Sequence, residues 1–181
     1  MDLASLPHDV RRAREFARAA HGDQRYGAHP YVVHLDDVVE ILAGLPARDE
    51  PTLIAGYLHD VVEDTDVTLV DVEEAFDVIV ARCVALLTDA PGESRKQRKA
   101  ATYARLARVA DGAPEARALV VKAADRLANV RRSVEDQNRR LLEMYRREHA
   151  AFRGAARRPG LTPALWDELD YLLEWTDEAT P

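Results

Sequence analysis

The sequence is poor in cysteine, in basic residues and in long apolar runs, and each shortage excludes a class of protein. Its one cysteine, Cys83, cannot form an intrachain disulfide, and its apolar neighbours predict a small helical core residue in a reducing compartment. With 25 Lys and Arg against 32 Asp and Glu, no broad basic surface is available for nucleic acid. No stretch approaches roughly 18 apolar residues, and the N-terminal segment lacks a cationic start followed by an apolar run. We therefore expect a soluble, cytoplasmic protein that binds neither nucleic acid nor membranes.

The sequence also lacks sustained apolar–polar alternation, the pattern of a half-buried strand, and apolar residues recur at helical spacing instead. We predict an all-α fold, a single bundle of about eight to ten helices within one domain over residues 1–181. The predicted helices cover about 8–20, 35–44, 50–63, 69–76, 77–88, 94–110, 114–130, 136–153 and 163–176. The last one lies in a C-terminal segment, 160–181, that is expected to pack on the bundle or on a second copy of the chain in a homodimer.

Residues 57–65 gather several chemically active side chains in one short tract. His59 and Asp60 stand among apolar residues, which predicts a mostly buried helix, and a buried charge must be paired or bind a metal ion. On one continuous helix, His59 lies one turn before Glu63 and Asp60 one turn before Asp64. The first pair would bind a divalent cation, and the second would act on water beside it. Candidates for the remaining ligands are His21, His29, His34, His149 and an interior acid such as Asp125.

Two further segments allow alternative interpretations. Lys122, Asp125 and Asn129 share one stripe of an otherwise apolar helix, which indicates either a polar site in the core or an ordinary Lys–Asp pair in solvent. The basic run over residues 95–99 is typical of a solvated helix face, and the alternative is a cationic rim that attracts polyphosphate. His149 lies among charged residues, so we expect it to be solvated.

Three motifs follow one another in the order and at the spacing of a known family. They are Ala20-His21-x-x-Gln24-Arg25-x-Gly27-x-x-Pro30-Tyr31-x-x-His34, Leu58-His59-Asp60-Val61-Val62-Glu63-Asp64-Thr65 and Lys122-x-x-Asp125-Arg126-Leu127-x-Asn129-x-Arg131. Over about residues 10–150 the chain resembles the HD-domain metal phosphohydrolases. Within them it resembles the hydrolase domain of the RelA/SpoT alarmone family and its small stand-alone versions, the metazoan SpoT homologs. A His-Asp pair alone is a weak signal, whereas three ordered motifs are specific.

The resemblance implies a hydrolase that removes the 3′-pyrophosphate from guanosine or adenosine alarmones, (p)ppGpp or (p)ppApp, in the stringent response. The products would be GDP or GTP, or ADP or ATP, together with pyrophosphate. The implied cofactor is Mn²⁺, with Fe²⁺, Co²⁺ or Zn²⁺ as alternatives, and the implied metal ligands are His34, His59, Asp60 and Asp125. The residues implied to act on the hydrolytic water are Glu63 and Asp64. Those implied to hold the nucleotide are Arg25, Tyr31, Lys122 and Asn129.

The chain departs from the family pattern at Tyr26, Leu35 and Ala128. Tyr26 stands where a basic residue is usual, which removes a positive charge beside the phosphates and offers an aromatic ring. Two other functions stay open: hydrolysis of another nucleotide, such as the phosphate of NADPH, and nucleotide sensing without catalysis. The presence of both Glu63 and Asp64 argues against a pure sensor. No resemblance to a synthetase domain is found, so alarmone synthesis is not expected.

Overall fold

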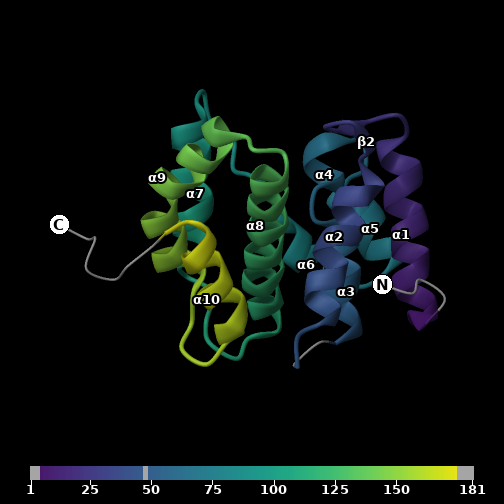
Figure 1. The fold of residues 1–181 in the computed structure, drawn as a ribbon. Helices are drawn as coiled ribbons and strands as arrows, with labels where there is room; N and C mark the ends of the chain where they lie inside the picture. Colours follow the sequence, from purple (N-terminus) through teal and green to yellow (C-terminus); the bar gives the residue numbers. More distant parts are fainter. Residues whose placement is uncertain (1–4, 47–48, 175–181) are drawn as a thin grey trace.

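The computed structural model describes residues 5–46 and 49–174, which form a helical bundle (Figure 1). Its elements in chain order are α1 (His8–His21), β1 (Arg25–Tyr26), β2 (His29–Pro30), α2 (Val32–Ala43), α3 (Glu50–Leu58), α4 (Val61–Asp64), α5 (Leu69–Ala75), α6 (Val78–Leu87), α7 (Arg95–Leu106), a 3₁₀ turn (Pro114–Ala116), α8 (Arg117–Glu135), α9 (Arg139–Ala156) and α10 (Pro163–Leu172). The predicted all-α class is confirmed. Among these helices none has the length and apolar character needed to cross a bilayer.

The long helix α8 is central, and other helices cover it on two sides (Figure 1). Helices α2, α3 and α6 pack on one side, while α9 and α10 pack on the other. Leu119 and Leu127 of α8 are almost completely buried, and each such side chain contributes about 1.5–3 kcal/mol. Phe152 of α9 and Trp166 of α10 belong to the same buried core, with ring centroids 5.4 Å apart. Because Asp125 lies on α8, the fold carries a carboxylate into the middle of the protein.

Side-chain caps fix the starts of helices at positions that the sequence predicts. Asp49 accepts a hydrogen bond from the backbone amide of Thr52 at the start of α3. Ser94 does the same for the amide of Gln97 at the start of α7. Such caps satisfy amides that have no partner within the helix, and each contributes about 1 kcal/mol. The cap at Asp49 sets the start of the helix that leads to His59.

The prediction of one continuous helix over residues 50–63 is wrong. Helix α3 ends at Leu58 and α4 begins at Val61, and Asp60 between them has φ −108° and ψ −3°. Apolar residues on both sides of the turn continue the helical spacing, which conceals the break in the sequence. The argument that stacks His59 on Glu63 along one helix therefore does not hold. One helical bond persists, since the Asp64 amide donates to the Asp60 carbonyl at 2.9 Å.

The segment between α1 and α2 forms a short antiparallel hairpin that the sequence pattern did not predict. Tyr26 of β1 pairs with His29 of β2, and Gly27 has φ +58° in the turn, a conformation that favours glycine. Strands of two residues are too short to show a period of two. Helix α2 then begins at Val32, earlier than the predicted start at 35, so His34 lies in its first turn.

The environment of His149 also differs from the prediction. The side chain is fully buried on α9, and its Nε2 lies 2.6 Å from Asp170 Oδ1 on α10. Burial lowers the pKa of His149. Leu165 and Trp166 of α10 are buried, and α10 packs on α8. The last residues of the helix predicted over 163–176 lie outside the described part of the chain.

Candidate metal centre

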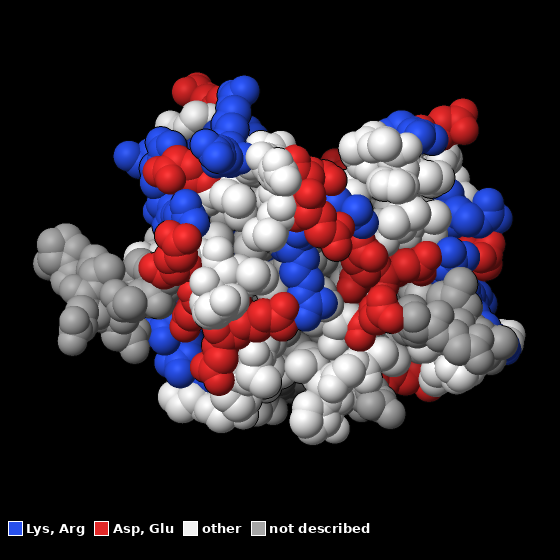
Figure 2. Space-filling view, in the orientation of Figure 1, with Lys and Arg blue, Asp and Glu red and all other residues white. Residues whose placement is uncertain are grey.

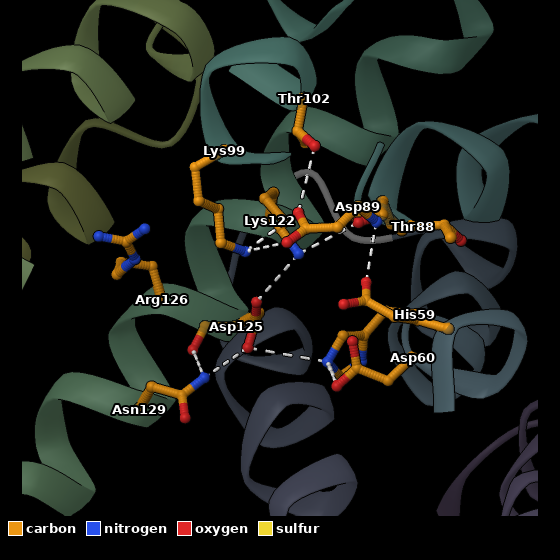
Figure 3. Close-up of polar contacts among 12 residues, drawn as sticks. His59, Asp60, Thr88, Asp89, Lys99, Thr102, Lys122, Asp125, Arg126 and Asn129 are labelled. Carbon is orange, nitrogen blue, oxygen red and sulfur yellow. Dashed lines mark hydrogen bonds and ion pairs between the residues drawn. The ribbon is translucent and has the colours of Figure 1, made fainter. Parts of the chain in front are cut away.

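Three elements that are distant in the sequence bring together His34, His59 and Asp125. His34 comes from the first turn of α2, His59 from the turn after α3, and Asp125 from the middle of α8. Each offers one ligand atom, and these atoms all lie within 4.8 Å of one another. Both histidines are buried, and Figure 3 shows His59 facing Asp125 across a narrow space. The arrangement gives a mixed nitrogen and oxygen ligand set within the distance that one metal ion can bridge.

The orientation of the His59 ring suits a metal ligand. Its Nδ1 lies 2.8 Å from the carbonyl oxygen of Gly56, and because a carbonyl only accepts, this nitrogen carries the proton. In its neutral form, the form that binds a metal ion, the ring therefore has its lone pair on Nε2, which is buried and turned toward Asp60 and Asp125. A hydrogen bond from the opposite ring nitrogen to a backbone carbonyl is the usual way to fix a metal-binding histidine.

Asp60 lies beside this group and is the fourth predicted ligand. Its Oδ2 is 2.9 Å from His59 Nε2 and 4.0 Å from His34 Nε2. The same oxygen accepts a hydrogen bond from the Tyr31 hydroxyl at 2.5 Å. The structure thus places the predicted ligands in one cluster, with Tyr31 holding the orientation of the Asp60 carboxylate.

The electrostatic balance of the cluster favours a cation. Burial alone would lower the pKa of His59, but the carboxylates of Asp60 and Asp125 outweigh it and raise that pKa to about 9. Burial also opposes the ionisation of Asp125, yet the Lys122 ammonium and both histidines hold the pKa of Asp125 well below its usual range. Two ionised carboxylates in a buried site require positive charge nearby. Donor types, spacing and charge therefore all fit a divalent metal ion.

A pocket of about 220 Å³ opens beside the cluster. Its walls come from β1, α2, α4, α7, α8 and α9. Figure 2 shows the upper edge of the molecule hollowed between the part formed by α7, α8 and α9 and the part that carries the hairpin. Glu63 and Asp64 both line the pocket, as do four basic residues: Arg95, Lys99, Lys122 and Arg126.

Glu63 and Asp64 reach the pocket from α4 with different partners. Glu63 Oε2 accepts a hydrogen bond from the backbone amide of Asp89 at 2.8 Å, and burial of its carboxyl group raises the pKa of Glu63. Asp89 in turn pairs with Lys99 at 2.8 Å (Figure 3). Asp64 Oδ2 accepts a hydrogen bond from the side-chain amide of Gln24 at 3.1 Å. The two carboxylates therefore border the same pocket in different electrostatic surroundings.

The predicted nucleotide contacts divide into residues inside and outside the pocket. Tyr31 lines it and stacks on His21, with ring centroids 4.3 Å apart. Lys122 is buried, with its Nζ 3.4 Å from Asp125 Oδ2 (Figure 3). Asn129 lines the pocket and donates to Asp125 Oδ1 at 2.6 Å. Arg25 is exposed on the hairpin, where it donates to the Ala28 carbonyl, and it is not among the lining residues.

Six lining residues were not among the site residues predicted from the sequence: Tyr26, Arg95, Lys99, Arg126, Tyr145 and Phe152. Arg95 and Lys99 border the pocket from α7, as the alternative of a cationic rim predicts for that basic run. Arg126 is buried, with its guanidinium carbon 4.8 Å from the ring centroid of Tyr145 and 4.5 Å from that of Phe152. Tyr145 also lines the pocket. The spacing of Arg95 and Lys99, four residues apart on one helix face, is the signal that could have identified them.

A larger hollow of about 460 Å³ lies elsewhere, between α2, α8 and α10. Its two arginines are ion-paired, Arg131 with Glu168 at 2.7 Å and Arg132 with Asp37 at 3.2 Å. The smaller pocket is the stronger candidate for a functional site, because among the hollows described it alone is lined by a histidine, ionised carboxylates and lysines together.

Comparison with known proteins places this geometry in a family. The profile of the HD domain matches residues 13–161. A guanosine-3′,5′-bis(diphosphate) 3′-pyrophosphohydrolase of Aquifex aeolicus is 37% identical over 124 residues, which are 68% of this chain and 17% of that protein. A probable enzyme of the same name from Synechocystis is 32% identical over 97% of this chain and 23% of its own length. The chain thus spans about a fifth of the length of these curated relatives.

A solved structure agrees over nearly the whole length of both chains. It belongs to a metazoan ortholog of SpoT that hydrolyses ppGpp, and it superposes with a TM-score of 0.77 at 29% sequence identity. The match covers 93% of this chain and 96% of the other. A second structure, of a Listeria monocytogenes protein, has a TM-score of 0.61 at 28% identity and covers 81% of this chain and 94% of that one.

Proposed function

This chain belongs to the HD-domain family and resembles the SpoT/RelA hydrolase domain, and from that premise we propose that it is a metal-dependent alarmone 3′-pyrophosphohydrolase. The observation that carries the proposal is the meeting of His34, His59 and Asp125 at the base of a pocket lined by Glu63 and Asp64. The names of the relatives favour a guanosine substrate, (p)ppGpp, and the adenosine counterpart (p)ppApp is the second substrate to test.

His34, His59, Asp60 and Asp125 would hold the metal ion. Mn²⁺ is the first candidate for this set of two imidazoles and two carboxylates, followed by Fe²⁺, Co²⁺ and Zn²⁺. When bound, such an ion polarises a phosphoryl group and makes a neighbouring water more acidic. The protein supplies the fixed His59 tautomer and the orientation of Asp60 through Tyr31.

Glu63 and Asp64 would manage the proton of the attacking water. Glu63 is the better base, because burial raises its pKa and a stronger base takes the proton more readily at neutral pH. The water oxygen would bond to the phosphorus attached to the 3′-oxygen, and the bond between that phosphorus and the 3′-oxygen would break. The 3′-oxygen takes up a proton, so that one water converts ppGpp into GDP and pyrophosphate.

The basic residues of the pocket would offset the charge of the substrate. Lys99, Lys122 and Arg126 line the same cavity as the metal centre, and a cationic group in a partly buried site attracts phosphate strongly. Tyr31 and Asn129 would contact the sugar or base from the pocket wall. Arg25 would contact the substrate only if its side chain leaves the Ala28 carbonyl and turns toward the pocket.

The test is product analysis with the purified, Mn²⁺-loaded protein. It is incubated with ppGpp and with ppApp, and the products are separated by ion-exchange chromatography. We expect equal amounts of pyrophosphate and GDP, and a loss of about 10²–10⁴-fold in turnover for Glu63→Gln. Glu73→Gln, an exposed carboxylate on α5, is the matched control and should behave as wild type.

Three other results would change the proposal. Release of orthophosphate would indicate a phosphatase for another nucleotide, and NADPH is then the next substrate to try. Turnover of neither alarmone by a protein that has bound Mn²⁺ would contradict the alarmone reaction. Mn²⁺ binding without turnover of any nucleotide would favour a sensor.

A further inference from the structure

Tyr26 joins the hairpin to two parts of the metal centre. Its hydroxyl lies 2.9 Å from Oδ1 of Asn129 on α8. Its ring stacks on the imidazole of His34, with centroids 4.6 Å apart and an angle of 27° between the planes. A residue of β1 thus touches one metal ligand directly and reaches a second one, Asp125, through Asn129.

The direction of these hydrogen bonds follows from the chemistry of the groups. An ionised carboxylate only accepts, so the end of Asn129 that lies 2.6 Å from Asp125 Oδ1 must be its NH₂ group. The same NH₂ group lies 3.0 Å from the Asp125 carbonyl. The amide oxygen of Asn129 therefore faces Tyr26, and because that oxygen only accepts, the Tyr26 hydroxyl must donate. The hydrogen bonds run in one direction, from Tyr26 to Asn129 to Asp125.

The hydrogen bonds from Tyr26 through Asn129 end at an atom of the ligand cluster. Asp125 Oδ1, the atom that Asn129 holds, is 3.4 Å from His34 Nε2 and 3.7 Å from His59 Nε2. A half-turn of the Asn129 amide would place its oxygen against the Asp125 carboxylate, which is repulsive. The Tyr26 hydroxyl opposes this turn, because it donates a hydrogen bond to the Asn129 oxygen and would face the NH₂ group, another donor, if the amide turned.

We propose that Tyr26 is a positioning residue of the metal centre, whose hydroxyl locks the Asn129 amide and thereby orients the Asp125 carboxylate, while its ring covers His34. The inference rests on the metal centre of the proposed function and not on the identity of the substrate. Asn129 can still accept a hydrogen bond from a substrate hydroxyl, because its oxygen has a second lone pair.

The test separates the hydroxyl from the ring. Tyr26→Phe keeps the ring over His34 and removes the donor, and we expect Mn²⁺ affinity, measured by isothermal titration calorimetry, to fall about 3–10-fold. Tyr57→Phe is the matched control, because it removes a hydroxyl bonded at 3.0 Å to another carboxylate, Asp36, outside the pocket lining. The control should leave Mn²⁺ affinity unchanged, even if both variants unfold at a lower temperature than wild type.

A double-mutant cycle adds a readout that a merely structural role would not move. In an Asn129→Ala background, Tyr26→Phe should cause no further loss of Mn²⁺ affinity, since the hydroxyl acts only through the amide. Independent, additive losses would overturn the inference, as would equal affinities of wild type and Tyr26→Phe. In that second case the proposed function stands. A wild-type protein that binds no Mn²⁺ would overturn both.

Discussion

Glu63 and Asp64 are neighbours in sequence, and we expect them to play different parts in the proposed reaction. Glu63, like Asp64, is exposed as a whole residue, but its carboxyl group accepts a hydrogen bond from the Asp89 amide, and burial of that group raises its pKa. The charges that face it act in both directions: the carboxylates of Asp89 and Asp60 raise the pKa further, and Lys122 lowers it. Asp64 is exposed and bonded to an amide. Glu63 is therefore the group expected to take the proton, with Asp64 assisting at the pocket mouth.

The pH dependence of turnover should report the ionisation of Glu63. A base acts only when deprotonated, so kcat falls as pH drops through its pKa, and a raised pKa moves that fall to higher pH. We expect the acid limb of the Mn²⁺-saturated enzyme to lie above 4.5, the ordinary value for glutamate, and to disappear from the residual activity of Glu63→Gln. Asp64→Asn should keep the limb at a lower rate. A limb at or below the ordinary value would assign the base elsewhere.

Among single residues, the sequence of 57–65 was enough to predict His59 and Asp60 as ligands, whereas the second histidine depends on how the helices pack. Four histidines were candidates for the second imidazole, and only the family resemblance selected His34. In the structure two of the other candidates have different partners: His21 stacks on Tyr31, and His149 is buried against Asp170. No local pattern separates these environments, because each depends on which helix lies opposite.

The helices themselves were predictable and their interruptions were not. Apolar spacing of 3.6 residues and capping residues such as Asp49 mark where most helices begin. The turn at His59 and Asp60 carries no glycine or proline, and apolar residues continue through it, so the sequence shows one long helix. This break matters for the site, because it allows His59 Nδ1 to reach the Gly56 carbonyl while Asp60 turns toward Tyr31.

Asp49 connects α3, the helix that leads to His59, with α8, which carries Asp125, and its substitution should show how much the cap and the ion pair each contribute to stability. Its Oδ1 caps α3, and its Oδ2 lies 2.7 Å from Arg117 Nε on α8. Asp49→Ala removes both interactions and should lower the free energy of unfolding by about 1–2 kcal/mol. Asp49→Asn retains the cap acceptor, and Arg117→Gln removes the partly exposed ion pair together with a hydrogen bond to the Pro114 carbonyl, so each should cost about 1 kcal/mol or less. Urea unfolding of the three variants measures this. Equal losses in all of them would show that the ion pair dominates and the cap contributes little.

At the scale of the whole molecule, the candidate metal centre lies where two groups of helices meet. The α2, α3 and α4 region supplies His34, His59 and Asp60, and α8 supplies Asp125 with the helices α9 and α10 behind it. The helical class followed from periodicity alone. The arrangement that joins these elements in one site could be predicted only through the family resemblance, because nothing local in the sequence specifies which helices pack on α8.

A metal ion held between these parts should stabilise the entire fold. An ion that binds only the native state at about 100 times its Kd adds about 2.7 kcal/mol, which for a chain of this size raises Tm by about 5–10 °C. We therefore expect Mn²⁺ to raise Tm by that amount in differential scanning calorimetry, and EDTA to reverse the rise. Asp125→Asn keeps the side-chain shape and removes a charged ligand, so its Tm should respond little to Mn²⁺. An equal rise in this variant would mean that the stabilising ion binds elsewhere. A wild-type Tm that does not change with Mn²⁺ would mean that α2 and α8 do not bind a common metal ion.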